Sequence, residues 1–274
     1  MKSRDIYSYL HEQLVPVFTA RDAEQHAYLL AEFVAASNTS DWQSLADRSV
    51  ERLLKGEPVQ YIIGYVWFYH LKLMVTPAVL IPRPETEELV DWLIQDYRKG
   101  LIHKSPSILD AGTGSGCIAL AISKQITEAI VTGIDVSGEA LKVARANAIL
   151  HQSKADFQCM DILHADLHGV YDVIISNPPY ISKEEFSQLS PSVRNFEPAI
   201  ALTPEENDAL IFYRKIAELG KTHLTSHGWI YAELNEFRAE DIRSIFADLG
   251  YSTEMRKDMQ GKWRMLKATR EKSL

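Results

Sequence analysis

The sequence has very few cysteines, since Cys117 and Cys159 are the only two in 274 residues. They do not form a Cys-x-x-Cys pair, and two isolated cysteines cannot supply the framework of a disulfide-rich secreted domain. A cysteine-built metal site and a disulfide scaffold are therefore excluded. A reducing cytoplasm is the compartment that we expect for such a chain.

Long apolar runs are also missing. Charged residues interrupt the first 14 positions every few residues, so this stretch lacks the apolar core of a signal peptide. No later apolar run is long enough to cross a membrane. We therefore expect a soluble protein without a membrane partner.

Positive charge is in deficit as well. The chain has 29 Lys and Arg against 37 Asp and Glu, a formal net charge of -8 and a pI near 5.6. Binding by phosphate neutralisation needs a face rich in Lys and Arg, and no basic stretch with interleaved aromatics is present. We expect no direct nucleic-acid binding, and a protein or small-molecule substrate is favoured.

The remaining composition is that of an ordinary folded protein, with 46% apolar and 24% charged residues, and the length allows one large or two modest domains. Residues 1 to about 60 place apolar side chains such as Ile6 and Leu10 at helical spacing, which predicts a small helical bundle. From 61 to 82, aromatic and β-branched residues predict a β-hairpin, with Thr76-Pro77 between its arms.

After residue 105, strand-like and helix-like segments alternate along the chain. The strand-like segments are SILDAG, AIVTGID, ADFQCM, YDVIISN and GWIYAEL, and a closing hairpin is expected around Gln260-Gly261. The helix-like segments between them are CIALAISKQ, EALKVARANAIL and DALIFYRKIAEL. This alternation predicts an α/β fold with a mostly parallel sheet that helices cover on both faces.

A glycine-rich turn over 110–116 (DAGTGSG) follows the first of these strands and opens a helix, where backbone N–H groups face a ligand. A dinucleotide fingerprint would need its third glycine at position 117, which is Cys117, whereas the third glycine is Gly116. The spacing therefore favours S-adenosylmethionine over NAD. The predicted cofactor-binding residues of this turn are Asp110, Gly112, Thr113, Gly114, Ser115 and Gly116.

Acidic residues end three strands in succession. Asp110 can accept from the methionine ammonium of the cofactor, whose carboxylate the loop amides and helix dipole favour. Asp135 can take the ribose hydroxyls, and Asp161 can accept from the adenine amine with Ile162 against the ring. A glycine turn that only packs a helix, and solvated acids at strand ends, form the alternative. The recurrence at one sheet edge favours a ligand site.

The motif Asn177-Pro178-Pro179-Tyr180 follows the apolar strand YDVIIS at the same sheet edge. Each proline stiffens the backbone, so the carbonyls are held outward. An amide or exocyclic aromatic nitrogen is a poor nucleophile because its lone pair is delocalised. The Asn177 side-chain oxygen and the Pro178 carbonyl can accept the two N–H bonds of a planar NH₂ group, and Tyr180 can stack on it. An ordinary turn is the alternative, which the preceding buried strand disfavours.

With these residues in place, the chain resembles the peptide chain release factor glutamine methyltransferases, the PrmC or HemK family, over nearly its whole length. The matching pieces are Pro58–Gly64 (PVQYIIG), Ile81–Glu87 (IPRPETE), Gly112–Gly116, Asn177–Tyr180, Phe196–Pro198, and Gly261 with Arg264. The resemblance implies a helical substrate-recognition domain over 1–64, a β-hairpin linker over 65–84 and a seven-stranded Rossmann-like S-adenosylmethionine methyltransferase domain over 85–274.

The resemblance also implies a substrate, the side-chain amide nitrogen (N5) of the glutamine in the Gly-Gly-Gln motif of class I peptide chain release factors. The sequence departs from the family at Phe196, where Tyr is more usual, and at 233–238, where Asn235 and Arg238 accompany the loss of the usual Gly and Gln. The polar segment 182–204 is the predicted substrate-contacting loop. Arg83 and Glu85 either contact ligands or initiate the following helix.

Three alternatives remain open at this point. A ribosomal-protein glutamine methyltransferase would share every catalytic residue and differ only in its docking surface. An adenine-N6 nucleic-acid methyltransferase also fits the motif at Asn177, but the acidic charge balance disfavours it. An intact motif argues against a non-catalytic binding module. His164 and His168 have metal-like spacing without a third ligand, so no metal is expected.

Overall fold

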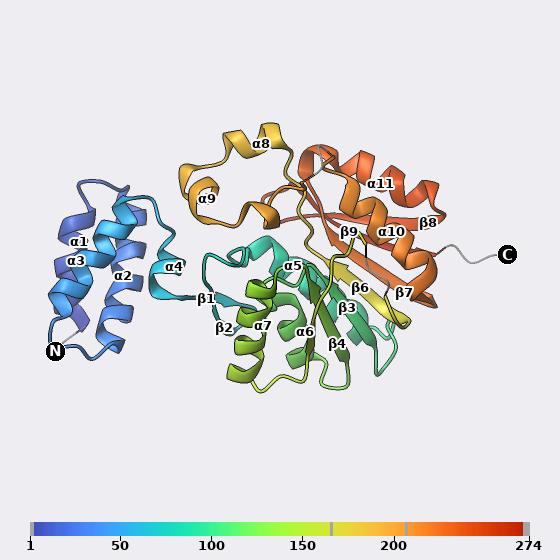
Figure 1. Cartoon of the computed structure of the whole chain (residues 1–274), viewed down its shortest axis with the longest axis horizontal. Coiled ribbons are helices and arrows are strands. Elements are labelled where there is room, and N and C mark those ends of the chain that lie inside the picture. Colours follow the sequence, from blue (N-terminus) through green and yellow to red (C-terminus); the bar gives the residue numbers. More distant parts are fainter. Residues whose placement is uncertain (1–2, 165–166, 206–207, 271–274) are drawn as a thin grey trace. The chain divides into compact units, whose positions relative to one another are not determined.

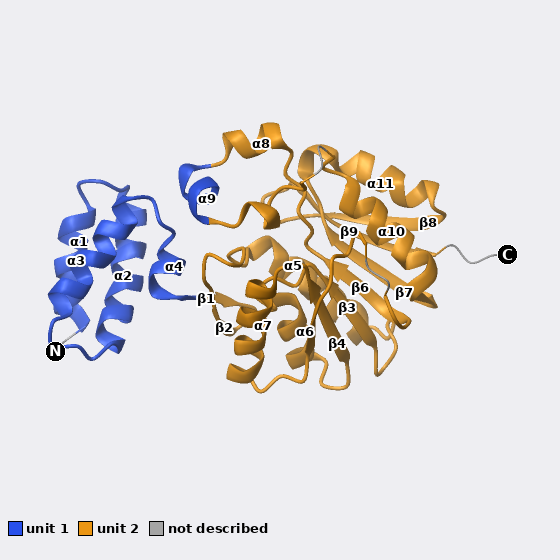
Figure 2. Ribbon diagram, in the orientation of Figure 1, with its two compact units in different colours: residues 1–65, 190–196 blue, residues 66–189, 197–274 orange. Residues whose placement is uncertain are grey.

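The computed structural model describes residues 3–164, 167–205 and 208–270, and these residues form two compact units. Unit 1 comprises residues 1–65 and 190–196, and unit 2 comprises 66–189 and 197–274 (Figure 2). Each unit has its own apolar core. No helix within the described ranges is long and apolar enough to cross a membrane.

Unit 1 is helical, which confirms the predicted small bundle. Buried apolar side chains of α1, including Ile6 and Leu10, pack with those of α2 and α3 in one cluster. The hydroxyl of Thr19 caps α2 by accepting from the backbone N–H of Asp22 at 3.2 Å. The helices of this unit are α1 (Ser3–Leu14), α2 (Ala20–Ala36), α3 (Trp42–Leu54), α4 (Val59–Ile63) and α9 (Pro191–Phe196).

The predicted hairpin exists, but its position in the sequence was wrong. Its strands are β1 (Tyr65–Phe68) and β2 (Leu71–Met74), joined at Tyr69-His70 with φ of 47° and 65°, and residues 75–83 form no strand. The segment before β1 is α4, which Gly64 ends in the left-handed conformation. A short apolar run does not distinguish a buried helix from a strand, and Tyr-His lacks the Asn-Gly signal of a two-residue turn.

Unit 2 contains, within the described residues, a seven-stranded sheet in the order β5-β4-β3-β6-β7-β9-β8 (Figure 1). All pairs from β5 to β7 are parallel, whereas β9 runs antiparallel to both of its neighbours. This confirms the predicted α/β fold and its closing hairpin. The strands are β3 (Ser107–Ala111), β4 (Ile130–Asp135), β5 (Asp156–Cys159), β6 (Tyr171–Ser176), β7 (Leu224–Glu233), β8 (Tyr251–Lys257) and β9 (Trp263–Arg270).

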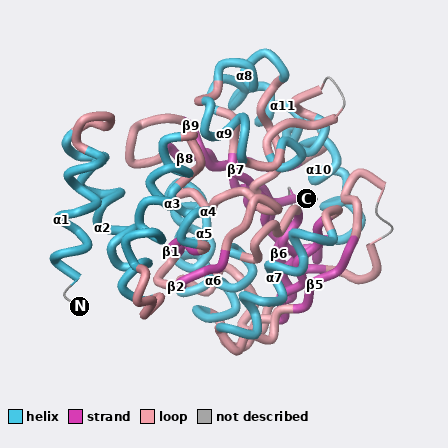
Figure 3. The backbone as a smooth tube through the Cα atoms, turned by 60° about the vertical axis from the view of Figure 1, so that its left-hand side comes forward, coloured by secondary structure: helices cyan, strands magenta, loops and turns pink. Residues whose placement is uncertain are grey.

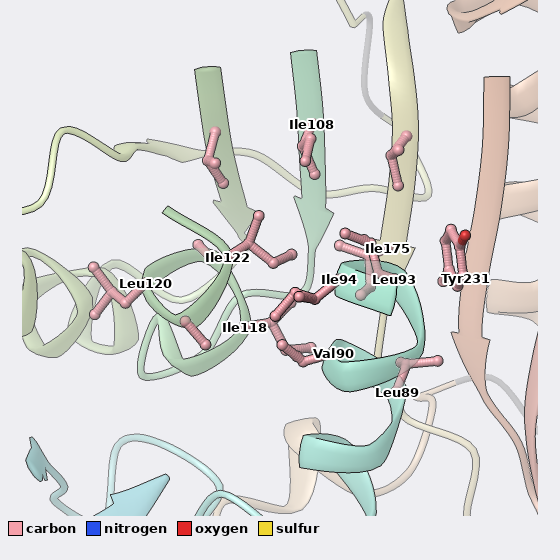
Figure 4. Close-up of a cluster of buried hydrophobic side chains, with 14 of the residues drawn as sticks. Leu89, Val90, Leu93, Ile94, Ile108, Ile118, Leu120, Ile122, Ile175 and Tyr231 are labelled. Atoms are coloured by element: carbon pink, nitrogen blue, oxygen red, sulfur yellow. The ribbon is translucent and has the colours of Figure 1, made fainter. Parts of the chain in front are cut away.

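Alternating residues of the strands point to opposite faces of the sheet, and each face packs against its own apolar layer. Ile108 and Ile175 pack toward one set of helices, and their neighbours Leu109 and Ile174 pack toward the other. Figure 4 shows side chains of α5 and α6 meeting those of the strands in the first layer. That layer holds α5 (Pro84–Arg98), α6 (Cys117–Gln125) and α7 (Gly138–Leu150), and the other holds α10 (Ile211–His223) and α11 (Ala239–Asp248).

The polar segment 182–204 is more regular than the predicted loop. It contains α8 (Lys183–Gln188), α9 and the 3₁₀ turn η1 (Ala199–Ala201), and Figure 3 draws α8 and α9 as helices. Ser182 begins α8 with a capping box, because its hydroxyl accepts from Glu185 N while the Glu185 carboxylate accepts from Ser182 N. Such short helices lack the apolar periodicity on which their prediction depends.

Candidate active site

A pocket in unit 2 lies at the carboxyl ends of β3, β4, β5 and β6. The strand order reverses at β3, with β4 on one side and β6 on the other, and ligands bind at such switch points in open α/β sheets. The pocket has an empty volume of about 1120 Å³ including its open mouth, which is ample for a nucleoside-sized ligand. The sequence-predicted residues that line it are Gly112, Gly114, Asp135, Asp161, Ile162, Asn177 and Pro179.

The glycine turn needs glycine for its backbone conformation. Gly112, Gly114 and Gly116 have φ of 76°, 54° and 80°, a region that disfavours other residues. A Cβ on Gly116 would also lie 3.1 Å from a ring carbon of Phe157. The backbone conformation of this turn therefore requires glycine at these three positions, the spacing that distinguishes it from a dinucleotide fingerprint.

The backbone N–H groups of this turn are largely used inside the chain. Those of Gly112 and Thr113 both donate to the Ile134 carbonyl at 2.9 Å, and Gly116 N donates to Thr113 O at 2.8 Å. Gly114 N donates to the Asp135 carboxylate at 2.8 Å. Four N–H groups of the turn are thus already engaged, and the predicted contact between loop amides and a ligand carboxylate stays a prediction.

Asp110 is fully buried directly behind the turn and does not itself line the pocket. Its Oδ2 accepts from the Thr113 hydroxyl at 2.6 Å and from Ala119 N at 3.1 Å, while Oδ1 has no hydrogen-bond partner among the described residues. Burial raises the pKa of this carboxyl to about 7, although both hydrogen bonds oppose the shift. An unpaired buried carboxylate oxygen is suited to a cationic donor, as the predicted ammonium contact requires.

Asp135 lines the pocket with both carboxylate oxygens anchored. Oδ2 accepts from Gly114 N, and Oδ1 accepts from Ser137 N at 2.9 Å where α7 begins. Burial raises the pKa of Asp135 against these bonds. Each oxygen keeps a second lone pair, so the carboxylate is held in place and can still accept from ligand hydroxyls.

Asp161 sits at the more exposed rim of the pocket. Its oxygens accept from Leu163 N at 2.9 Å and pair with His164 Nδ1 at 2.7 Å. Burial acts to raise the pKa of Asp161, but the bonds from His164 and Leu163 outweigh it and hold the pKa below its usual value. The described residues contain no group of side chains suited to a metal ion, and His164 is a partner of Asp161.

Asn177 belongs to a hydrogen-bonded chain that the sequence did not predict. Its Nδ2 donates to Thr86 Oγ1 at 3.0 Å, and the Thr86 hydroxyl donates to Glu233 Oε2 at 2.6 Å. The Tyr180 hydroxyl donates to the other oxygen, Oε1, at 2.9 Å. Burial raises the pKa of Glu233, and the bonds from Thr86 and Tyr180 act in the opposite direction.

Thr86 and Glu233 both stand in segments that the sequence had singled out, yet neither received a role. Glu233 ends a buried strand at the same sheet edge as Asp110 and Asp135, which was the available signal. Thr86 lies in the first turn of α5, where a hydroxyl suggests nothing beyond helix initiation.

Two residues of the Asn177–Tyr180 motif do not line the pocket. Pro178 is buried, and Tyr180 packs against the apolar layer of α10 while its hydroxyl binds Glu233. Burial raises the pKa of the Tyr180 phenol far above its ordinary value, so this hydroxyl remains a donor. The predicted contacts of Pro178 and Tyr180 with a substrate stay predictions, as do the ligand contacts of Thr113, Ser115 and Gly116, which are buried beside the pocket.

Residues whose roles the sequence left open form ion pairs and hydrogen bonds between segments near the site. Arg83 Nη2 binds the buried carboxylate of Glu197 at 2.5 Å, and Glu85 accepts from Gln260 Nε2 at 3.3 Å near the surface. Asn235, one of the departures from the family pattern, donates to the Tyr180 carbonyl at 3.2 Å and caps η2 (Glu236–Arg238) through Phe237 N.

The arrangement as a whole combines two functions in one pocket. Fixed carboxylates stand where a ligand with hydroxyl and amino groups would be bound, and the carboxamide of Asn177 stands beside them with its nitrogen already engaged. The remaining amide oxygen is an acceptor for a second molecule. Such a site suits the transfer of a group from a bound cofactor to a donor N–H.

Comparison with known proteins gives consistent results. A family model described as methyltransferase small domain matches residues 90–192. A release factor glutamine methyltransferase from Flavobacterium psychrophilum is 36% identical over 93% of this chain and 95% of that protein. One from Bacteroides thetaiotaomicron is 41% identical over 80% of this chain and 78% of that protein. A solved methyltransferase from Pyrococcus furiosus, 21% identical, shares the fold with a TM-score of 0.54 over 81% of this chain and 97% of that one.

Proposed function

The chain belongs to the release factor glutamine methyltransferase family, and from that premise we propose that it methylates the side-chain amide nitrogen (N5) of the glutamine in the Gly-Gly-Gln motif of class I peptide chain release factors. The observation that carries this proposal is the carboxamide of Asn177, which lines the pocket with its nitrogen bound to Thr86 and its oxygen left to accept. That oxygen matches the N–H of a planar amide.

S-adenosylmethionine supplies, when bound, an electrophilic methyl group on sulfur. The residues that would hold the cofactor fit its parts. The unpaired oxygen of Asp110 suits the ammonium, the anchored carboxylate of Asp135 suits the ribose hydroxyls, and Asp161 with Ile162 suits the adenine. The positive φ of the glycine turn lets the backbone approach closely without side chains between.

The chain's own residues prepare the acceptor nitrogen. Asn177 Oδ1 and the Pro178 carbonyl accept its two N–H bonds, the stiff Pro178-Pro179 backbone holds the carbonyl, and the bond to Thr86 holds the Asn177 carboxamide. Holding the acceptor nitrogen in one orientation would offset the low nucleophilicity of an amide. No general base is required before attack, because the N–H becomes acidic only on methylation, and the proton would then leave to water at the open mouth of the pocket.

The pocket supports the type of reaction more directly than it supports the choice of protein substrate. A ribosomal-protein glutamine would fit the same acceptors, and the names of the relatives favour the release factor. Unit 1 is proposed to recognise the protein substrate, and segment 182–204 to contact it. The cytoplasm remains the compartment that we propose.

The test combines Asn177→Ala with a choice of acceptors. We expect the variant to bind the cofactor within about twofold of wild type in calorimetry, and to lose methyl transfer by about 10² to 10³, the effect of removing one oriented hydrogen-bond partner. Equal losses of binding and transfer would refute the role of Asn177. Labelled cofactor is supplied with four separate acceptors: an intact purified release factor, the same factor with its Gly-Gly-Gln glutamine changed to alanine, ribosomal proteins, and DNA. Label on any acceptor except the intact release factor contradicts the proposed substrate.

A further inference from the structure

The carboxamide of Asn177 has two chemically different ends of nearly the same size. With the oxygen toward the pocket it accepts from a substrate N–H, whereas with the nitrogen toward the pocket it donates and would favour a carboxylate. Since rotation of the amide exchanges the two, the reaction needs a device that holds one orientation. The described residues supply one, beginning at Glu233.

The direction of every bond in this device follows from Glu233. Burial raises the pKa of Glu233, whereas the bonds from Thr86 and Tyr180 favour its ionised form, in which we take it. An ionised carboxylate accepts and does not donate, so both hydroxyls point their hydrogens at it. The Thr86 oxygen, having used its only hydrogen, can then only accept from Asn177, at 3.0 Å. The group of Asn177 that faces Thr86 is therefore the NH₂, and Oδ1 faces away.

The three links come from different parts of unit 2. Thr86 lies in the first turn of α5, Asn177 follows β6, and Glu233 ends β7. Thr86 is not a helix cap, because its hydroxyl donates to a carboxylate and α5 has Arg83 at its N-cap position. Glu233 is 2% exposed, so water does not compete for its oxygens. Local turn geometry does not account for this alignment.

We propose that Thr86 and Glu233 are positioning residues that hold the Asn177 carboxamide with its oxygen toward the substrate, and that they thereby make the site select a neutral NH₂-bearing side chain over a carboxylate. This inference rests on the proposed function. It adds that selectivity between glutamine and glutamate is set by two residues that do not touch the substrate.

The decisive variant is Thr86→Val, which keeps the shape of the side chain and removes the acceptor for Asn177 Nδ2. We expect about 10- to 100-fold lower kcat on the intact release factor, with cofactor affinity within about twofold. A release factor carrying glutamate at the target position is added as a competitive inhibitor. Its affinity relative to that of the glutamine form should rise about tenfold or more in the variant, because the freed amide can turn its NH₂ toward the carboxylate.

Matched variants separate positioning from a general structural effect. Thr86→Ser retains the hydroxyl and should restore most of kcat and the wild-type preference for glutamine. Thr269→Val removes another hydroxyl of the same unit, which donates to the Gly228 carbonyl at 3.1 Å, and should change neither quantity. Thr86→Val combined with Asn177→Ala should be no slower than Asn177→Ala alone, because the first residue acts through the second.

The outcomes distinguish the inference from the function on which it rests. If Asn177→Ala is inactive while Thr86→Val keeps wild-type kcat and selectivity, the positioning role is overturned and the proposed function stands. The same conclusion follows from additive losses in the double variant. Absence of methylation by the wild-type chain overturns the proposed function and this inference with it. Should Thr86→Val not fold, Glu233→Gln tests the same link. The new amide NH₂ can donate to Thr86, whose hydroxyl would then donate to Asn177 Oδ1 and turn the Asn177 NH₂ toward the substrate.

Discussion

Asp110 makes cofactor binding depend on pH. Burial raises the pKa of its carboxyl to about 7, and the proposed contact with the cofactor ammonium requires the ionised form. Protonated Asp110 must therefore lose its proton before the cofactor binds. Affinity should rise as pH rises through the pKa of the free protein, with a proton released on binding below that pH.

The size of the effect follows from the fraction ionised. With a pKa of about 7, the ionised fraction of Asp110 is about 9% at pH 6 and about 76% at pH 7.5, while the ammonium fraction of the cofactor falls by about a quarter, so affinity should increase about sixfold over this interval. Higher pH is avoided, because the amino group of the cofactor has its own pKa near 8. Asp110→Asn loses a charge-assisted bond, so binding at pH 7.5 should weaken by about 10- to 100-fold.

The same group affects stability with a definite sign. An acid whose pKa is higher in the folded state than in the unfolded chain adds stability that is complete below the unfolded value of 3.8. This contribution, of the order of 4 kcal/mol for a shift of about three units, is lost as pH rises through about 7. Asp110→Asn should therefore reduce the fall in unfolding free energy of the cofactor-free chain between pH 5 and pH 8.

Calorimetry of cofactor binding at pH 6 and pH 7.5, in two buffers of different ionisation enthalpy, measures both affinity and proton release. Urea unfolding at pH 5 and pH 8 measures the stability change. Because Asp135 also has a raised pKa, the informative quantity is the difference between wild type and Asp110→Asn. A pH dependence of binding that is identical in the two proteins would refute the reasoning.

Two further predictions concern the turn and the buried glutamate. Gly116→Ala should lower the free energy of unfolding by about 1–3 kcal/mol, because the new Cβ meets Phe157 and the backbone is strained. Gly250→Ala, with a similar φ of 81° but nothing within 4 Å of its Cβ, should lower it by only about 1 kcal/mol through backbone strain. Equal losses in urea unfolding would contradict the tight contact with Phe157. Tyr180→Phe removes a hydrogen bond that lowers the pKa of Glu233, so the acid-side midpoint of the kcat–pH profile should move to higher pH. The control Tyr251→Phe loses a hydrogen bond to a backbone carbonyl and should leave this midpoint unchanged. A midpoint that does not move in Tyr180→Phe would show that Glu233 need not be ionised.

Sequence patterns predicted unit 2 well because its signals are local. A buried strand, a helix and the turn between them each leave a periodicity or a glycine at a fixed spacing. The hairpin was misplaced because residues 61–63 are a short apolar run that suits a strand as well as a helix, and the segment is helical where Val59, Ile62 and Ile63 are buried in the core of unit 1. The turn at Tyr69-His70 carries no sequence signal, so its left-handed backbone was not predictable.

The sequence by itself determined the glycine turn, the acids at three strand ends and the motif that begins at Asn177, because each depends on residues adjacent in the chain. Only the tertiary structure decided which way Asn177 faces. Thr86 lies 91 positions before Asn177 and 147 before Glu233, and they meet because β6 and β7 are neighbours in the sheet and α5 packs against it. Hydrogen-bond direction between residues so distant leaves no periodicity in the sequence, since it follows from the position of a single buried carboxylate.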